Sequence, residues 1–286
     1  MEPRFSLPSV IKTNNITNFE AWLPPVPKAA CTMGPNLLER LAELGSLHDA
    51  ASSLGLDQEL AWDYLVAANN LADVPLLRPH AASLTPTRQG RNLLCRSENL
   101  ARDFQDFLDA PSGGAFRQFQ LRHQFLRRLA ARTSARNQFY CRIRSVRRER
   151  VNAVVTLDLG GTDQLAAHIT AHSAEELGLV GGRACHALIE PAWVEVLPDS
   201  AQGLNGRHNC LRGRVVRCLE DPVDTEVAIE LAGGRIVIAA MAQAEMADKG
   251  VAPGRTVCVL IQSSQIILAV DQSAADSTVF LTGGQS

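Results

Sequence analysis

The sequence has no run of apolar residues long enough to cross a membrane, and its start lacks the apolar core of a secretion signal. Its seven cysteines form no Cys-x-x-Cys pair and stand singly, several of them in apolar, strand-like runs. Reduced, buried thiols are therefore expected rather than a disulfide framework or a zinc site. No grouping of nucleophile, base and acid stands out either. The sequence predicts a cytoplasmic protein that is not an enzyme, holds no metal and has no contact with a membrane.

Lysine is scarce as well: the chain has 28 lysine and arginine residues, and only Lys12, Lys28 and Lys249 are lysines. The charge is also uneven, because residues 1–110 carry 9 basic and 13 acidic side chains, whereas residues 115–150 carry 11 arginines and one glutamate. Such a basic segment is compatible with contact to nucleic acid. It is equally compatible with a solvated linker whose arginine stems lie on a β-surface.

The sequence from residue 133 onward contains two copies of one pattern, with short alternating strands, a Gly-Gly turn, a short helix and two further strands. Gly161 corresponds to Gly233 with an offset of 72, whereas Arg136 corresponds to Arg207 with an offset of 71, which predicts one small indel. A tandem repeat of this kind is strong evidence about architecture. It predicts two small β-barrels that could share one core, with short helices over 174–179 and 245–250.

The N-terminal half has the spacing of a helix-turn-helix. Pro35 is suited to the first turn of a helix. Ser46 is suited to cap a short second helix, and Gly55 to make the tight turn after it. Asp57 then caps a predicted third helix over 58–70.

Residues 76–78 and 82–85 could pair as a short wing, and a long helix is predicted to follow as far as Leu108. Its apolar face includes Phe104 and suits dimerisation, so a homodimer is expected. The fold class is α+β and multidomain, with a winged-helix-like domain and dimerising helix before the tandem barrels. The predicted segments are 1–34 irregular, 35–110 winged helix and dimerisation helix, 111–132 basic linker, 133–200 first repeat, 201–271 second repeat and 272–286 flexible tail.

These features together resemble the ModE-type, molybdate-responsive transcriptional regulators, whose C-terminal half is a pair of Mop domains with an OB-like barrel fold. The resemblance runs from about Leu37 to Asp271. Its most specific parts are the string Thr-Ser-Ala-Arg-Asn-Gln at 133–138 and the segment 169–179. It implies a cytoplasmic, homodimeric regulator that binds molybdate or tungstate and, through its helix-turn-helix, operator DNA.

The resemblance also implies an oxyanion site in each repeat. A tetrahedral dianion is held by hydroxyls, backbone N–H groups and fixed cations. Suitable groups in the first repeat are Ser134, Ala135, Arg136, Thr170 and Ser173, although helix capping is an equally good interpretation of the last two. In the second repeat, Arg207 and Ser263 are the candidates.

The first repeat departs from the family at Glu190 and Pro191, where the family usually has Lys-Ser. A carboxylate there would repel a dianion, and proline removes both a hydroxyl and an N–H donor. If the anion site survives, Glu190 is expected to form an ion pair with Arg136 and so to imitate the bound ligand.

For DNA, the resemblance points to Gln58, Trp62, Asn69 and Arg78. Residues 46–70 contain no lysine or arginine, and phosphate contacts normally supply most nonspecific affinity, so this segment is unusually acidic for DNA contact. Core or interface packing is the alternative for Trp62. The alternative function is that of a divergent Mop protein that has lost DNA binding and buffers an oxyanion or serves in protein assembly.

Overall fold

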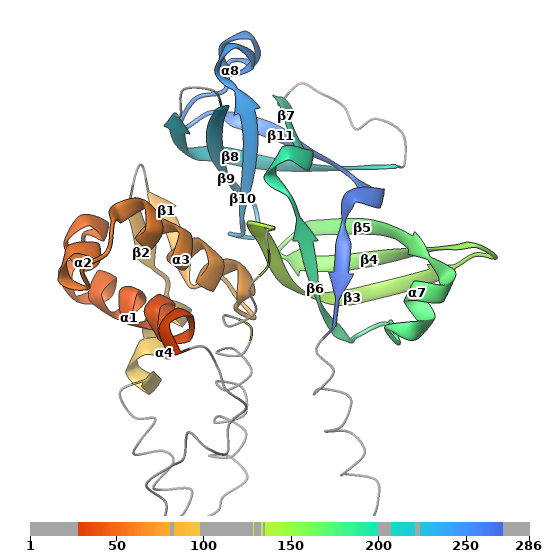
Figure 1. Ribbon diagram of the computed structural model, residues 1–286, viewed down its shortest axis with the longest axis horizontal. Coiled ribbons are helices and arrows are strands. Elements are labelled where there is room, and N and C mark those ends of the chain that lie inside the picture. The colour runs from red at the N-terminus through yellow and green to blue at the C-terminus, as the bar shows by residue number, and fades with distance from the viewer. Residues whose placement is uncertain are drawn as a thin grey trace, which may run out of the picture.

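The computed structural model describes residues 28–80, 83–97, 128, 133, 135–199, 207–220 and 224–270. Figure 1 shows a helical unit beside two curled antiparallel sheets. Within the described residues, no helix is long and apolar enough to span a membrane. The fold is the predicted one, α+β with an N-terminal winged-helix-like unit and tandem OB-like β units.

The helical unit follows the predicted order. Its elements are α1 (Lys28–Leu44), α2 (Leu47–Ser53), α3 (Gln58–Leu71), β1 (Leu77–His80), β2 (Ser83–Pro86) and α4 (Arg88–Ser97). Ser46 caps α2 by accepting from the Asp49 amide at 3.3 Å, and Asp57 caps α3 by accepting from the Glu59 amide at 2.9 Å. Strands β1 and β2 pair as the predicted wing. Helix α1 begins seven residues before Pro35, which therefore lies inside the helix rather than at its start. The predicted dimerisation helix lies outside the described residues beyond Ser97.

The repeats form two five-stranded antiparallel sheets with the orders β12-β6-β3-β4-β5 and β10-β9-β8-β11-β7. The first repeat contributes β3 (Asn137–Arg148), β4 (Asn152–Gly160), β5 (Asp163–Thr170), α7 (Ala171–Glu176), β6 (Ala184–Ile189), η3 (Pro191–Trp193) and β7 (Val194–Pro198). The second contributes β8 (His208–Glu220), β9 (Asp224–Leu231), β10 (Ile236–Ala242), α8 (Gln243–Lys249), β11 (Thr256–Gln262), η4 (Ser263–Gln265) and β12 (Ile267–Ala269). Each repeat therefore has the predicted short helix, two or three residues earlier than expected.

The repeats exchange their last strands. Strand β7 ends the first repeat but pairs with β11 of the second sheet, and β12 ends the second repeat but pairs with β6 of the first. The inner faces of both sheets contribute to one continuous apolar core, which includes Phe139, Leu157, Ile229 and Val259. The shared core that the repeat predicted is confirmed, and the exchange explains why neither sheet is complete without the other.

A pseudo-twofold axis relates the repeats with a constant offset of 72. Asn137 lies opposite Ile189 in the first sheet as Asn209 lies opposite Ile261 in the second. Arg136 therefore corresponds to His208, so the predicted indel and the pairing of Arg136 with Arg207 are wrong. The error arose because Arg136 was matched to Arg207, an identical residue that lies one position before the true equivalent.

Asparagine side chains mark this symmetry by crossing from each repeat to the other. Asn137 donates to the Ile238 carbonyl at 2.8 Å and accepts from its amide at 2.7 Å. Asn209 makes the equivalent pair of bonds with Ala166, at 3.0 and 2.6 Å. Each amide satisfies the outward backbone groups of an edge strand, β10 or β5, which would otherwise be unpaired.

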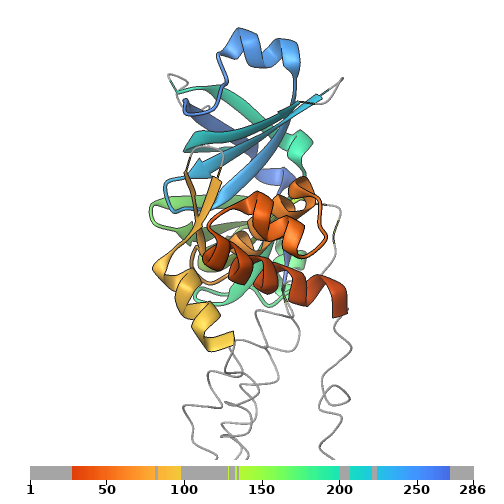
Figure 2. The ribbon, with the colours of Figure 1, turned by 90° about the vertical axis from the view of Figure 1, so that its left-hand side faces the viewer.

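The helical unit packs on the outer face of the second sheet. Val216, Ala228, Ile236 and Ile238 are buried with the helical core, which includes Trp62. Figure 1 shows α3 lying against the edge where β10 approaches β3, and Figure 2 shows the same contact from the side of the helices. The second sheet is thus covered on both faces, by the first sheet and by the helices.

The cysteines differ from expectation at one pair. Cys210 of β8 and Cys258 of β11 form a disulfide, whereas Cys141, Cys185 and Cys218 are free. The partners lie on adjacent strands with Cα atoms 6.2 Å apart, a proximity that single spacing along the chain does not reveal.

Candidate oxyanion and interdomain site

Arg136 immediately precedes β3, where the helical unit and both repeats meet. Its guanidinium bonds to the carboxylate of Asp63 from α3 through one terminal nitrogen and to that of Glu226 from β9 through the other. The residue predicted to hold an oxyanion thus holds two negative charges supplied by the protein. The ion pair predicted between Arg136 and Glu190 is not the arrangement found, because Asp63 and Glu226 take both terminal nitrogens.

The two carboxylates are partly shielded from water. Burial raises the pKa of Asp63, and Arg136 opposes this rise. Burial likewise raises the pKa of Glu226, and Arg136 opposes it while the neighbouring Asp63 adds to it. Arg136 is therefore the main charge that offsets burial at these two carboxylates, and Arg217 of β8 acts in the same direction.

Thr170 and Ser173 come together as a helix cap. The Thr170 hydroxyl accepts from the Ser173 amide at 3.0 Å and donates to the Ser173 hydroxyl at 2.8 Å, at the first turn of α7. Capping, one of the two interpretations of this pair, is therefore present. Both residues are exposed enough for their remaining lone pairs and hydroxyl hydrogen to meet solvent.

The other candidates of the first repeat are placed differently. Ser134 lies outside the described residues. Ala135 is buried, and its carbonyl accepts from the Gln138 side chain at 3.0 Å. Glu190 is half-buried and immediately precedes the 3-10 turn η3, with Pro191 as the first residue of that turn.

In the second repeat, the structure brings Arg207 and Ser263 together through the backbone. The Ser263 amide and hydroxyl both donate to the Arg207 carbonyl, at 2.9 and 2.8 Å. Ser263 is buried, and its two donors are already used by that carbonyl. This pair therefore serves the turn η4 and offers an incoming anion little beyond the exposed Arg207 guanidinium.

Two of the predicted DNA-binding residues are core residues. Trp62 is 1% exposed, and the Arg217 guanidinium carbon lies 5.0 Å from its ring centroid. Asn69 is fully buried: its amide nitrogen donates to the Gly234 carbonyl at 2.9 Å and its oxygen accepts from the Leu76 amide at 2.8 Å. In this arrangement neither side chain is available to DNA, because α3 turns that face toward the second sheet. Gln58 and Arg78 are exposed, as contact with DNA requires.

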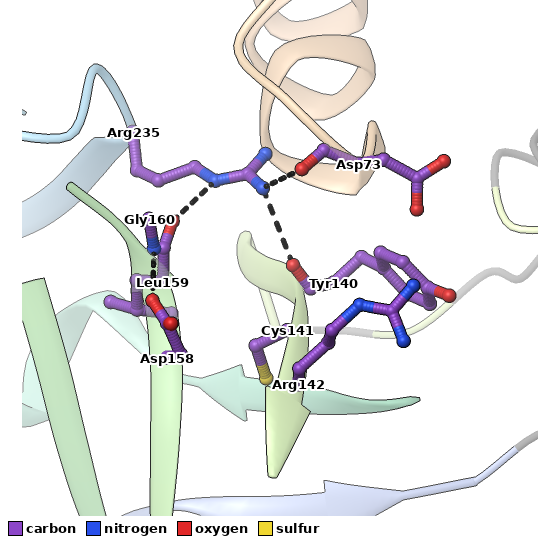
Figure 3. Close-up of a pocket in the computed structure, with 8 residues that line it drawn as sticks. All are labelled: Asp73, Tyr140, Cys141, Arg142, Asp158, Leu159, Gly160 and Arg235. Carbon is purple, nitrogen blue, oxygen red and sulfur yellow. Dashed lines mark hydrogen bonds between the residues drawn. The ribbon is translucent and has the colours of Figure 1, made fainter. Parts of the chain in front are cut away.

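The principal residue that sequence reasoning missed is Arg235. This side chain is 2% exposed and donates to the carbonyls of Asn69 at 2.6 Å, Ala72 at 2.9 Å and Leu159 at 3.1 Å. Figure 3 shows it reaching from the second repeat past Leu159 to Tyr140 and Asp73. Burial lowers the pKa of Arg235 to about 10, so the guanidinium remains charged at neutral pH.

Three of the carbonyls that Arg235 binds, those of Asn69, Asn70 and Ala72, lie at the C-terminal end of α3, where the helix dipole favours a cation. Arg128, from the basic segment, is also buried at this end and donates to the Leu71 carbonyl at 3.2 Å. Its guanidinium carbon also lies 3.4 Å from the centroid of the Tyr140 ring. The stacking of an arginine on the β-surface was one of the two interpretations of the basic segment, and Arg128 follows it. A cavity of about 160 Å³ adjoins Tyr140 and Arg235.

Among the described residues, no group of histidine, cysteine and carboxylate side chains could hold a metal ion. The candidate residues instead carry guanidinium and hydroxyl groups. Such groups bind oxyanions through hydrogen bonds and charge rather than through coordination. The candidate residues do not meet at one place in this chain, because Arg136 precedes the first residue of β3 whereas Thr170 pairs with Asn152 beside the last.

Comparisons with known proteins identify the family of the chain. The TOBE domain model matches residues 133–196 and 208–268. The chain is 32% identical over 246 residues to the "Molybdenum transport protein ModE" of Azotobacter vinelandii, covering 82% of this chain and 90% of that one. It is 26% identical to the "DNA-binding transcriptional dual regulator ModE" of Escherichia coli (strain K12), covering 82% and 90%.

A solved structure of the "cytoplasmic molybdate-binding protein ModG" with molybdate bound has 34% identity and a TM-score of 0.47, and the match covers 49% of this chain and all of that one. The similarity to the Azotobacter protein extends over nearly its whole length and includes the helical unit as well as both repeats. The chain therefore belongs to the ModE family of tandem Mop-domain proteins.

Proposed function

We propose that the chain is an oxyanion-responsive transcriptional regulator, with molybdate or tungstate as its ligand and Arg136 as the principal cation of the site. The observation that carries the proposal is the position of Arg136. It lies in the Thr-Ser-Ala-Arg-Asn-Gln string, at a junction of three units, and it is already bonded to two carboxylates. A guanidinium that bonds two carboxylates also suits a dianion. A tetrahedral oxyanion, like the two carboxylates together, can present one oxygen to each terminal nitrogen.

The regulator interpretation is supported by the relatives, which include proteins named as DNA-binding regulators. The alternative, in which the chain only buffers an oxyanion, is not favoured by that set. The proposal places the protein in the cytoplasm and assigns signalling to the helix-turn-helix, with exposed Gln58 and Arg78 as its candidate DNA contacts.

Calorimetric titration of the full-length protein with molybdate, and separately with tungstate, tests the ligand. Arg136→Ala is expected to weaken binding by about tenfold or more, because a hydrogen bond from a charged group contributes about 1.5–3 kcal/mol. The matched control is Arg144→Ala, which removes an exposed arginine from β3, the strand that follows Arg136, and leaves Arg136 in place. Equal affinities for Arg136→Ala and the unmodified protein would place the oxyanion elsewhere.

A second variant, Glu190→Lys, tests the departure from the family. Replacing this carboxylate by an ammonium is expected to strengthen molybdate binding, because it removes repulsion near the site and adds a cation. The gain should disappear when Arg136→Ala is added to the same chain. Tight binding that Glu190→Lys leaves unchanged would show that Glu190 does not face the anion.

The proposal also includes a homodimer built on the apolar face that contains Phe104, a residue outside the described part of the chain. Phe104→Glu is expected to give monomers or aggregates, because a buried carboxylate would destabilise an apolar interface. Light scattering measures the mass directly. A dimer of unchanged mass and stability would exclude this face as the interface.

A further inference from the structure

Helix α3 is covered on two sides. It packs against α1 and α2 on one side and against β3 and β10 on the other, as Figures 1 and 2 show. The second helix of a helix-turn-helix reads DNA by entering the major groove, which is about 12 Å wide. To enter it, the helix must present the face that points away from its two partner helices. In this structure that face contacts the second sheet beyond the exposed first turn, residues 58–60, so the docked arrangement keeps the rest of α3 out of a DNA groove.

The contact between α3 and the repeats has two kinds of tie. One is uncharged on the α3 side and buried: the Asn70 side chain donates to the Ile236 carbonyl at 2.7 Å and accepts from the Ile236 amide at 3.0 Å. The other is ionic and partly exposed: Arg136 joins Asp63 of α3 to Glu226 of β9. The side chain of Arg136 is 40% exposed, so a small ion in solvent can reach it, unlike the buried tie.

Within the described residues, Arg136 is the only cation bonded to both carboxylates of the ionic tie, while Arg217 of β8 acts on them at longer range. Asp63 and Glu226 come from opposite sides of the contact and have the same charge, so each attracts Arg136 and repels the other. When Arg136 is neutralised or drawn to a different anion, the same two carboxylates push α3 away from β9. Arg136 therefore supplies the main attraction in this part of the contact, and Arg217 offsets only part of the repulsion that remains without it.

We propose that Arg136 is an interdomain latch that holds α3 against the second repeat, and that an oxyanion bound at Arg136 opens the latch by competing with Asp63 and Glu226. The latch itself follows from the geometry of this chain, whereas its trigger rests on the proposed function. Opening exposes the α3 face that a DNA groove would receive. The buried hydrogen bonds of Asn70 and Arg235 favour the docked form whatever ion is bound at Arg136. They therefore determine how far the equilibrium between docked and undocked α3 shifts.

Two amides of β10 report the opening with an internal reference. The Ile236 amide is held by Asn70 from α3, whereas the Ile238 amide is held by Asn137 from the first repeat. Undocking of α3 removes the partner of Ile236 and leaves that of Ile238 in place. Residue-resolved hydrogen exchange by NMR on the full-length protein therefore separates opening of this contact from general loosening of the sheet.

In the Arg136→Ala variant the Ile236 amide is expected to exchange about fivefold faster, whereas exchange at Ile238 should not change. A fivefold change corresponds to about 1 kcal/mol, which is the stabilisation expected from two partly exposed ion pairs. Asp63→Asn should act in the same direction. Arg144→Ala is the matched control, because it removes an exposed charge from β3 outside the latch. Asn70→Ala shows the exchange rate of an Ile236 amide without its partner.

Added molybdate should accelerate exchange at Ile236 in the unmodified protein and have no effect in Arg136→Ala. If Arg136→Ala and Asp63→Asn leave Ile236 unchanged, the latch is wrong whatever molybdate does. If calorimetry shows molybdate binding at Arg136 while Ile236 is unaffected, the trigger is wrong and the proposed ligand stands. If no oxyanion binds, the proposed function fails, and an accelerated Ile236 in Arg136→Ala still supports the latch.

Discussion

Arg235→Ala is expected to destabilise the protein by about 3 kcal/mol or more, among the largest effects of any single change in the described part of the chain. The guanidinium donates to carbonyls of α3, β3 and β4, and removing it leaves buried acceptors from all three elements unsatisfied. It also removes a cation from the negative end of the α3 dipole, where Arg128 would remain as the second buried arginine. Equilibrium denaturation with urea, followed by circular dichroism, measures the loss.

Two controls separate the role of Arg235 from that of positive charge in general. Arg235→Lys keeps the charge but offers one ammonium, which cannot span carbonyls on three elements, so most of the loss should persist. Arg214→Ala removes an exposed arginine paired with Glu230 in the same sheet and should change stability by less than about 1 kcal/mol. Similar stability of Arg235→Ala and Arg214→Ala would refute this role for the buried side chain.

Gly233→Ala is expected to cost about 1–3 kcal/mol, as overpacking does, because the two repeats meet backbone to backbone at this glycine. A Cβ atom there would lie 2.3 Å from the Gly160 carbonyl oxygen. Because that oxygen belongs to the backbone, no side-chain rotation can relieve the contact. The shift would also disturb the bond in which the Gly233 amide donates to the Asp163 carboxylate at 2.6 Å.

Gly181→Ala is the matched control for this prediction. The Cβ atom at position 181 would have its nearest contact 3.4 Å away, at the Arg144 carbonyl oxygen, and its backbone is not left-handed. Thermal unfolding of both variants should show a clear loss for Gly233→Ala and a small change for Gly181→Ala. Equal losses would mean that glycine flexibility, rather than close approach of the repeats, explains Gly233.

The local elements of this fold follow from residues that act over a few positions. Ser46 and Asp57 cap α2 and α3 because their side-chain oxygens can reach amides two or three residues later. The tandem repeat could be detected in the sequence because equivalent strands have the same alternation of apolar and polar residues. These signals are short in range, and they were sufficient for element order and for the tandem barrels.

The site was less predictable, because its contacts join residues far apart in the sequence. The string around Arg136 identified the residue, but its partners Asp63 and Glu226 come from a helix and from the other repeat. Asp63 belongs to the segment 46–70, whose lack of basic residues argues against DNA contact, and its basic partner Arg136 comes from outside that segment. Arg235 follows a Gly-Gly turn, and nothing in that setting indicates that it will be buried.

The exchanged strands have a consequence for the order in which the chain can fold during synthesis. The first sheet needs β12, whose residues 267–269 are made some 80 positions after β6, its partner in that sheet. During synthesis the first repeat therefore emerges from the ribosome with one edge of β6 unpaired, and this edge stays unpaired until the second repeat has emerged. Such an edge can pair with another nascent chain, so rapid closure by β12 protects the protein against misassembly as well as completing its core.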